Sequence, residues 1–280
     1  MFLFLRYFLP KLGNVYLNLN MLFKDISSQN WLNFLMMCAD EADVITDHYF
    51  RKNQFKIQEK PDLTPVTQAD IEAEEKIRQL VQHHYPQLPI LGEELGSCPE
   101  EAEIKLIIDP IDGTKNFIRG IPHFATLLAI EKNKKIIAGL VSAKATSSRW
   151  WASLGNGAFY NGQPIHVSSV NRLADSLIFH GSLYGPEARV GTEKLLKLLS
   201  KSPRQRGVGD YLMYTMVACG WGECAVDAGL KPWDLAPMAI LLNEAGGKVS
   251  LLDGSAFHPY AGNIVCSNAW VHDEVIDALK

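Results

Sequence analysis

Residues 109–114, with the sequence DPIDGT, constrain the fold of this chain more than any other stretch. They follow an almost uninterrupted apolar run at 104–108, which predicts a buried strand. Pro110 favours an extended backbone at Asp109, and Gly113 permits a tight reversal immediately afterwards. We therefore expect the two aspartates of this stretch to point at one place at the end of a sheet.

Two carboxylates at such close range repel each other unless a cation or a shared proton offsets their charge. A hard cation with oxygen ligands meets this need, and magnesium fits better than zinc because no His or Cys lies nearby in the sequence. The alternative interpretation is a polar turn, in which Asp and Gly serve turn geometry alone. The hexapeptide by itself leaves both interpretations open.

Composition restricts the class of protein. The chain has 280 residues, of which 47% are hydrophobic and 21% are charged, as in a globular protein of one large or two modest domains. Its net charge of -4 and its lack of a basic block argue against nucleic acid as a main partner. The five cysteines form no Cys-x-x-Cys pair, so we expect reduced, mostly buried thiols in a cytoplasmic protein.

Residues 1–24 form an N-terminal extension that matches no regular element. Its apolar, aromatic start is too short to span a bilayer and is interrupted by Arg6, Pro10 and Lys11. It has neither the basic start nor the small-residue cleavage site of a signal peptide. We expect Met21 to be an alternative start and no stable membrane association, with a weak membrane anchor as the other interpretation.

The rest of the chain alternates between periodic segments and turns. Apolar spacing predicts helices over 28–49, 70–84, 192–199, 211–219 and 232–246, and a last helix from about residue 271. Short apolar or alternating runs predict strands at 55–58, 89–91, 104–108, 123–131, 135–142, 149–153, 176–179, 223–227, 248–252 and 264–266. Two prolines predict a loop over 60–70, in which Thr67 and Asp70 have capping-box spacing.

These elements predict two halves that share an interface near residue 170. Residues 25–168 read as an α+β half and residues 169–280 as an α/β half. The first half carries most of the candidate oxygen ligands, and the second half completes the site. The candidates are Glu93, Asp109, the Ile111 carbonyl, Asp112 and Asp234. Four acids from three distant segments, each at a strand end or a helix start, exceed what turn chemistry predicts.

At these residues the chain resembles the inositol monophosphatase superfamily. The resemblance lies in GEE at 92–94, in DPIDGT with Asn116 and Phe117, and in WD at 233–234 followed by EAGG at 244–247. It covers nearly all of residues 28–280 in matching order and spacing. It implies a layered αβαβα sandwich of the inositol monophosphatase and fructose-1,6-bisphosphatase type. It also implies a magnesium-dependent phosphomonoesterase that lithium inhibits, and a homodimer.

The same resemblance implies a set of magnesium ligands. Glu93, Asp109 and the Ile111 carbonyl would hold one ion, and Asp109, Asp112 and Asp234 would hold a second. Glu93 would also reach a more loosely held third ion. Four carboxylates carry enough negative charge to hold such ions without thiol ligands.

Residues next to these ligands would carry out the chemistry. By resemblance, Thr114 paired with Asp70 would orient and deprotonate a metal-bound water, and Glu94 would lie in the shell around that site. The backbone amides of Gly113 and Thr114 would cradle phosphate oxygens at the start of the next helix.

The resemblance implies a small phosphate ester as substrate. Several segments resemble the histidinol-phosphate phosphatase branch: Lys115, TPVT at 64–67, GDY at 209–211 and LKPWD at 230–234. Asp227 matches the acid that contacts substrate across the family, and Asp210 matches a second acidic contact in this branch. Acids there suit a cationic amine, which favours hydrolysis of histidinol phosphate to histidinol in histidine biosynthesis. Inositol phosphate, a nucleotide 3′-phosphate and a non-catalytic metal- or phosphate-binding regulator remain alternatives. Asp227 could also merely bind hydroxyls, and Asp210 merely cap a helix.

Overall fold

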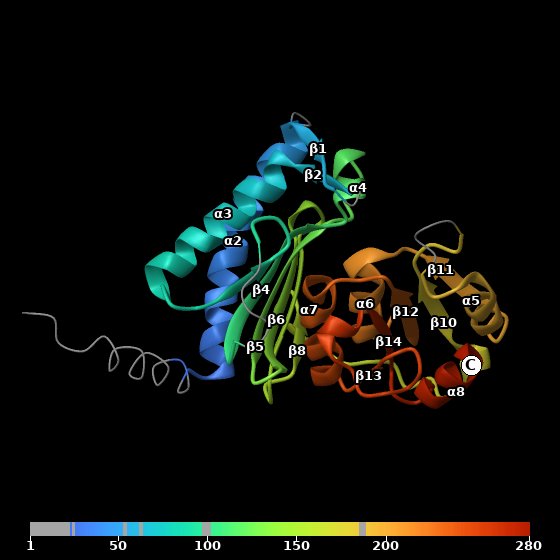
Figure 1. The fold of residues 1–280 in the computed structure, drawn as a ribbon. Helices are drawn as coiled ribbons and strands as arrows, with labels where there is room; N and C mark the ends of the chain where they lie inside the picture. The colour runs from blue at the N-terminus through green and yellow to red at the C-terminus, as the bar shows by residue number, and fades with distance from the viewer. Residues whose placement is uncertain (1–22, 24–25, 53–54, 62–63, 97–101, 185–188) are drawn as a thin grey trace, which may run out of the picture.

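Helices and sheets alternate in layers, as Figure 1 shows in a computed structural model of the protein. A helix pair, a seven-stranded sheet, a second helix pair, a five-stranded sheet and a third helix pair follow one another. The structure describes residues 23, 26–52, 55–61, 64–96, 102–184 and 189–280. The αβαβα sandwich expected from the sequence is confirmed.

The first helix pair covers the outer face of the seven-stranded sheet. Its helices are α2 (Ser28–Lys52) and α3 (Gln68–His84). The strands, in spatial order, are β3 (Ile90–Gly92), β4 (Ile104–Asp112), β5 (Ala125–Lys132), β6 (Lys135–Ala143), β7 (Ser148–Ser153), β8 (Ala158–Tyr160) and β9 (Gln163–Ile165). The pair β3–β4 is parallel, and the later neighbours are antiparallel. Trp31, Leu35 and Ile77 of the helices are fully buried against Leu106 and Leu128 of the sheet.

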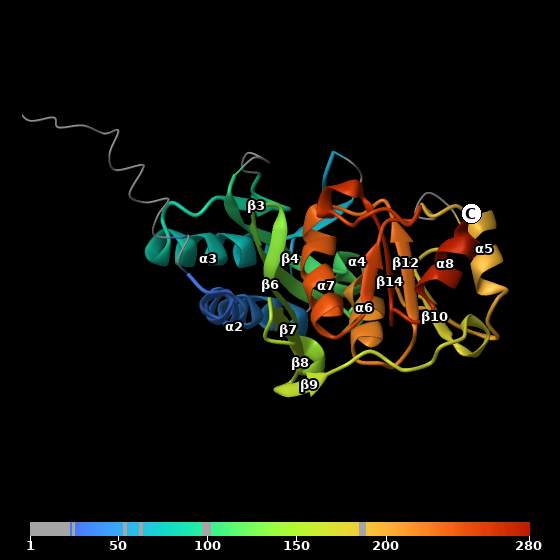
Figure 2. The same ribbon diagram turned by 90° about the horizontal axis from the view of Figure 1, so that it is seen from below.

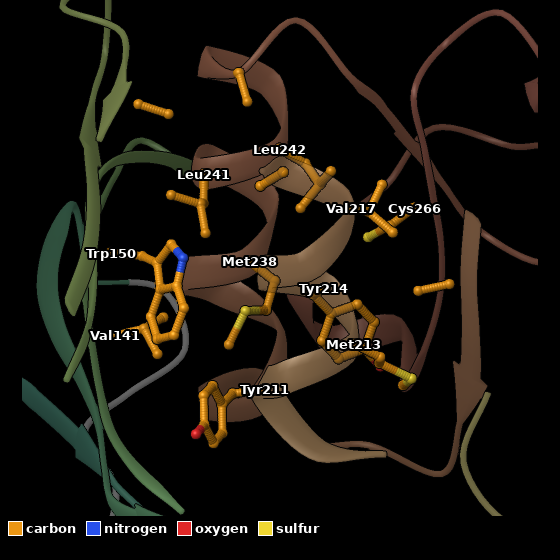
Figure 3. Close-up of a cluster of buried hydrophobic side chains, with 14 of the residues drawn as sticks. Val141, Trp150, Tyr211, Met213, Tyr214, Val217, Met238, Leu241, Leu242 and Cys266 are labelled. Carbon is orange, nitrogen blue, oxygen red and sulfur yellow. The ribbon is translucent and has the colours of Figure 1, made fainter. Parts of the chain in front are cut away.

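The second helix pair lies between the two sheets (Figure 2) and consists of α6 (Asp210–Ala218) and α7 (Pro232–Glu244). Figure 3 shows its core, in which Trp150 and Val141 of the sheet face Met238 and Tyr211 of these helices. A glycine permits the close approach: a Cβ at Gly139 would lie 2.5 Å from the Ile240 Cγ2 atom. The Ile240 side chain and the Pro237 backbone of α7 therefore pack directly against the backbone of β6 at this point.

The second sheet and the outer helices complete the fold. The strands, in spatial order, are β11 (Arg204–Gly207), β10 (Leu177–His180), β12 (Cys224–Ala228), β14 (Asn263–Ser267) and β13 (Lys248–Ser250). The outer helices are α5 (Thr192–Leu199) and α8 (His272–Leu279). Leu195 and Leu198 of α5 are buried with Val275 of α8 against this sheet. The short helix α4 (Thr114–Ile118) follows β4 directly.

The structure corrects the sequence analysis in a small hairpin of β1 (Ile57–Glu59) and β2 (Pro65–Thr67). The strand expected at 55–58 is present but begins at Ile57, and its expected half-burial is wrong, because all of β1 is exposed and Ile57 is 53% exposed. The predicted loop contains β2, since a proline is tolerated at the end of an edge strand. The capping box of Thr67 and Asp70 at the start of α3 is confirmed.

Three further strands were not expected from the sequence, namely β8, β9 and β11. In addition, β4 continues through Pro110 to Asp112, with a register shift between Asp109 and Asp112.

Cys38, Cys224 and Cys266 are buried free thiols and Cys219 is partly buried, whereas Cys98 lies outside the described residues. Of the N-terminal extension only Phe23 is described. Among the helices formed by the described residues, none is both long enough and apolar enough to cross a membrane.

Candidate active site

Acidic side chains from three elements meet at the end of β4. Carboxylate oxygens of Glu93, Asp109 and Asp234 lie within 4.8 Å of one another. Glu93 and Asp109 come together because β3 and β4 are parallel, with Gly92 opposite Ile108, so both strands end at the same edge. Asp234 comes from the first turn of α7. Every ligand atom of this cluster is a carboxylate oxygen, which is the donor set of a hard cation.

Burial makes this cluster electrostatically unfavourable by itself. Burial and then the Glu93 charge hold the pKa of Asp109 well above its usual value, and burial and then Asp210 do the same for the pKa of Asp112. Burial also raises the pKa of Asp234 to about 7, with a further contribution from Glu93. A bound cation would favour the charged carboxylates, so the residues present fit a divalent metal site.

Backbone amides orient these carboxylates. The Ile111 amide donates to Asp109 Oδ1 at 2.9 Å, and the Lys231 amide donates to Asp234 Oδ2 at 2.8 Å. The Tyr211 amide, at the start of α6, donates to Asp112 Oδ2 at 2.6 Å. One oxygen of each aspartate is therefore fixed by a backbone amide, locally for Asp109 and Asp234 and from a distant segment for Asp112.

Glu74 of α3 holds the turn that carries Glu93, and the sequence analysis did not identify it. Glu74 Oε2 accepts from the Glu94 amide at 2.9 Å, and Oε1 accepts from the Leu95 amide at 3.3 Å and from Arg78 Nη2 at 2.7 Å. Gly92 makes this possible, because a Cβ there would lie 2.0 Å from Glu74 Oε1. The available signal was a charged residue on the apolar face of a helix.

Lys60 is a second residue that the sequence analysis placed only in a loop. Its Nζ donates to Glu93 Oε1 at 2.6 Å and to Glu94 Oε1 at 2.7 Å. Burial lowers the pKa of Lys60, but the contacts with Glu93 and Glu94 outweigh this effect, so the pKa is raised overall. Burial raises the pKa of Glu94 to about 7. The ammonium group therefore offsets part of the negative charge beside the cluster.

Thr114 and Asp70 lie together next to these acids. The Thr114 hydroxyl is 3.4 Å from Asp70 Oδ1 and 3.0 Å from the Ile111 carbonyl oxygen. Asp70 Oδ2 accepts from the Thr67 amide at 2.8 Å and from the Thr67 hydroxyl. Burial raises the pKa of Asp70 to about 6. Gly113, with φ of 86°, forms the turn between Asp112 and this threonine.

A cavity of about 600 Å³ is lined by acids from distant segments of the chain. Asp109, Asp112 and Thr114 line it together with Asp210 and Asp227. The structure therefore brings the predicted metal ligands and both predicted substrate contacts to one cavity. Asp210 Oδ2 accepts from Asn116 Nδ2 at 2.9 Å, and Asp227 Oδ1 accepts from the Ala228 amide at 2.8 Å. Three basic residues also line the cavity: Lys115, Arg119 and Arg189.

Comparison with known proteins agrees with this site. The chain is 40% identical over 259 residues to a histidinol-phosphatase of Mycobacterium tuberculosis, covering 90% of this chain and 99% of that protein. It is 38% identical over 258 residues to a histidinol-phosphatase of Streptomyces coelicolor, covering 89% and 96%. A solved inositol monophosphatase from Anabaena superposes with a TM-score of 0.80 at 28% identity, covering 90% of this chain and 95% of that one.

The layered fold, the partly buried acidic cluster and these relatives define a phosphatase, that is, a phosphoric monoester hydrolase. The family model of the inositol monophosphatase family matches residues 27–279. The chain belongs to this family, whose members depend on metal ions. The resemblance stated from the sequence is confirmed.

Proposed function

We propose that this protein is a magnesium-dependent phosphatase that hydrolyses histidinol phosphate to histidinol, a step of histidine biosynthesis. The observation that carries the proposal is the shared cavity, in which Asp210 and Asp227 face the carboxylate cluster. The two relatives named histidinol-phosphatase support it. Inhibition by lithium, a homodimer, a cytoplasmic location and the division into halves at 25–168 and 169–280 belong to the same proposal.

The proposed magnesium ligands, for two or three ions, are Glu93, Asp109, the Ile111 carbonyl, Asp112 and Asp234. When bound, the ions would lower the pKa of the attacking water and offset the charge of the phosphate group. All proposed ligand atoms are oxygens. In Asp109, Asp112 and Asp234 a backbone amide already orients one carboxylate oxygen.

Thr114 and Asp70 would activate the water. Because Thr67 engages Asp70 Oδ2, the other oxygen of Asp70 faces the Thr114 hydroxyl. In the proposed reaction Thr114 gives its proton toward Asp70 and accepts the proton of the attacking water, so the pair acts as the general base. Glu94 would keep Lys60 beside the cluster, and the Gly113 and Thr114 amides would bind phosphate oxygens.

Asp210 and Asp227 would select the leaving group. Histidinol phosphate carries an amine that is protonated at neutral pH, and each charge-assisted hydrogen bond to it is worth roughly 1.5–3 kcal/mol, or about ten- to a hundred-fold in binding. A neutral polyol would gain less from two acids. This is why we place histidinol phosphate ahead of inositol phosphate and of nucleotide 3′-phosphates.

The test is phosphate release from histidinol phosphate, inositol 1-phosphate, 3′-phosphoadenosine 5′-phosphate and p-nitrophenyl phosphate, with Mg²⁺ and with a chelator. Asp227→Asn should lower kcat/KM for histidinol phosphate about tenfold or more relative to p-nitrophenyl phosphate. Thr114→Ala should damage both substrates alike, because it acts on the water and not on the leaving group. Equal losses in Asp227→Asn, or a preference of the wild type for inositol 1-phosphate, would refute the histidinol assignment. Activity that survives exhaustive chelation would refute the metal assignment.

A further inference from the structure

Asp210, the first residue of α6, has a left-handed backbone conformation that residues other than glycine rarely adopt. Its φ is +49°, and it follows Gly209 with φ of +63°. Aspartate and asparagine tolerate the left-handed region better than most residues, whereas β-branched residues are strongly disfavoured there. A residue held in this region at a candidate active site calls for an explanation.

The left-handed turn determines where the next amide points. The N–H of Tyr211 donates to Asp112 Oδ2 at 2.6 Å, across the boundary between the two halves of the chain. The Tyr211 side chain anchors the helix start, because it is 1% exposed and packs with its ring centroid 6.0 Å from that of Trp150 (Figure 3). With the ring fixed, the φ and ψ angles of Asp210 set the direction of this N–H.

The side chain of Asp210 is also held. Its Oδ2 accepts from Asn116 Nδ2 at 2.9 Å, and the same amide group donates to the His123 carbonyl at 2.9 Å. Asn116 of α4 therefore holds the side chain of Asp210, while the bond to Asp112 is made separately by the backbone amide of the next residue.

We propose that Asp210 is a positioning residue for the metal site: its left-handed backbone aims the Tyr211 amide at Asp112 and so fixes the orientation of that carboxylate. The role is separate from the contact of its side chain with substrate. The inference rests on the proposed function, because it takes Asp112 to be a magnesium ligand. Backbone geometry at residue 210, more than its charge, then determines metal affinity.

The test is Mg²⁺ titration of the full chain by calorimetry, with unfolding temperatures of the metal-free proteins. Asp210→Gly and Asp210→Asn keep access to the left-handed region and should bind Mg²⁺ within about threefold of wild type. Asp210→Val has nearly the size of aspartate but disfavours this region, so it should bind about tenfold more weakly or worse, as expected for a lost hydrogen bond to a charged group. Asp210→Ala should fall between them, and it keeps the test decisive if the valine variant does not fold.

Asn161 provides a matched control, because it has φ of +47° in the turn between β8 and β9. Asn161→Val should lower the unfolding temperature and leave Mg²⁺ affinity unchanged. Losses of equal size in the glycine, asparagine and valine variants of Asp210 would show that charge matters, and equal affinity in all of them would show no role; either result overturns the inference while the proposed function stands. Absence of Mg²⁺ binding by the wild type would overturn the metal assignment and this inference with it.

Discussion

Replacement of Glu74 by glutamine should damage the metal site from a distance. The Glu74 side chain is fully buried and accepts hydrogen bonds from Arg78 and from the Glu94 and Leu95 amides. Glutamine keeps the shape but has one acceptor oxygen, and its amide group must face either Arg78 or the Glu94 amide. The turn that carries Glu93 then loses part of its attachment to α3.

The size of the effect follows from these contacts. If the new amide group faces the Glu94 N–H, that donor is left unsatisfied, which costs about 1–3 kcal/mol. The negative charge that pairs with Arg78 is also lost. Because 28% of the Arg78 side chain is exposed, solvent screens this ion pair and its contribution is small. We expect a loss of about 2–4 kcal/mol in the free energy of unfolding.

Urea unfolding and Mg²⁺ titration by calorimetry measure the two consequences. Glu74→Gln should lower the free energy of unfolding and should also weaken Mg²⁺ binding, because Glu93 is less well held. Glu75→Gln makes the same chemical change on the exposed side of α3 and should stay within about 0.5 kcal/mol of wild type. A Glu74→Gln protein with wild-type stability and wild-type Mg²⁺ affinity would refute the reasoning.

Two further predictions concern the metal site and a buried histidine. Asp112→Asn should leave the fold nearly intact and reduce turnover by several powers of ten, on the order expected when a catalytic metal is misplaced; a near wild-type rate at limiting Mg²⁺ would show that Asp112 is only a turn residue. Burial lowers the pKa of His272 from 6.5 to about 4, so the unfolded chain binds the proton more readily. Its stabilising contribution is therefore present above pH 6.5 and lost as the pH falls toward 4, by about 3 kcal/mol. Urea midpoints of wild type and His272→Gln should converge over this range, and a constant difference would contradict the lowered pKa of His272.

The sequence predicted the acidic cluster because its members occupy positions with strong local signals. Asp109 follows an apolar run, Glu93 follows another, and Asp234 opens a helix behind a proline. Such positions lie at strand ends and helix starts, which meet at one edge of a parallel strand pair. The structure places Glu93, Asp109 and Asp234 together, as that reasoning requires.

The missed features lack a local signal. The strand β11 has the sequence RQRG and is exposed along its whole length, so no apolar period marks it. Lys60 contacts Glu93 and Glu94, which lie 33 and 34 residues further along the sequence. A lysine in a polar loop carries no sequence signal for such a distant partner. The left-handed φ of Asp210 depends on the packing of α6 and has only Gly209 as a local hint.

The site gathers acids from distant segments of the chain into one place, and their mutual repulsion gives a physical reason for metal dependence. Glu93 directly follows β3, Asp109 lies in β4, Asp234 belongs to α7, and Asp112 is held by the start of α6. Because these carboxylates repel one another, the apolar core between the first sheet and the helices α6 and α7 must hold the sheet and these helices together without a cation. A cation that binds only this folded arrangement stabilises it by mass action, by about 2.7 kcal/mol at a hundred times its dissociation constant. The charge that destabilises the empty cluster is thus the same charge that would select for a metal ion.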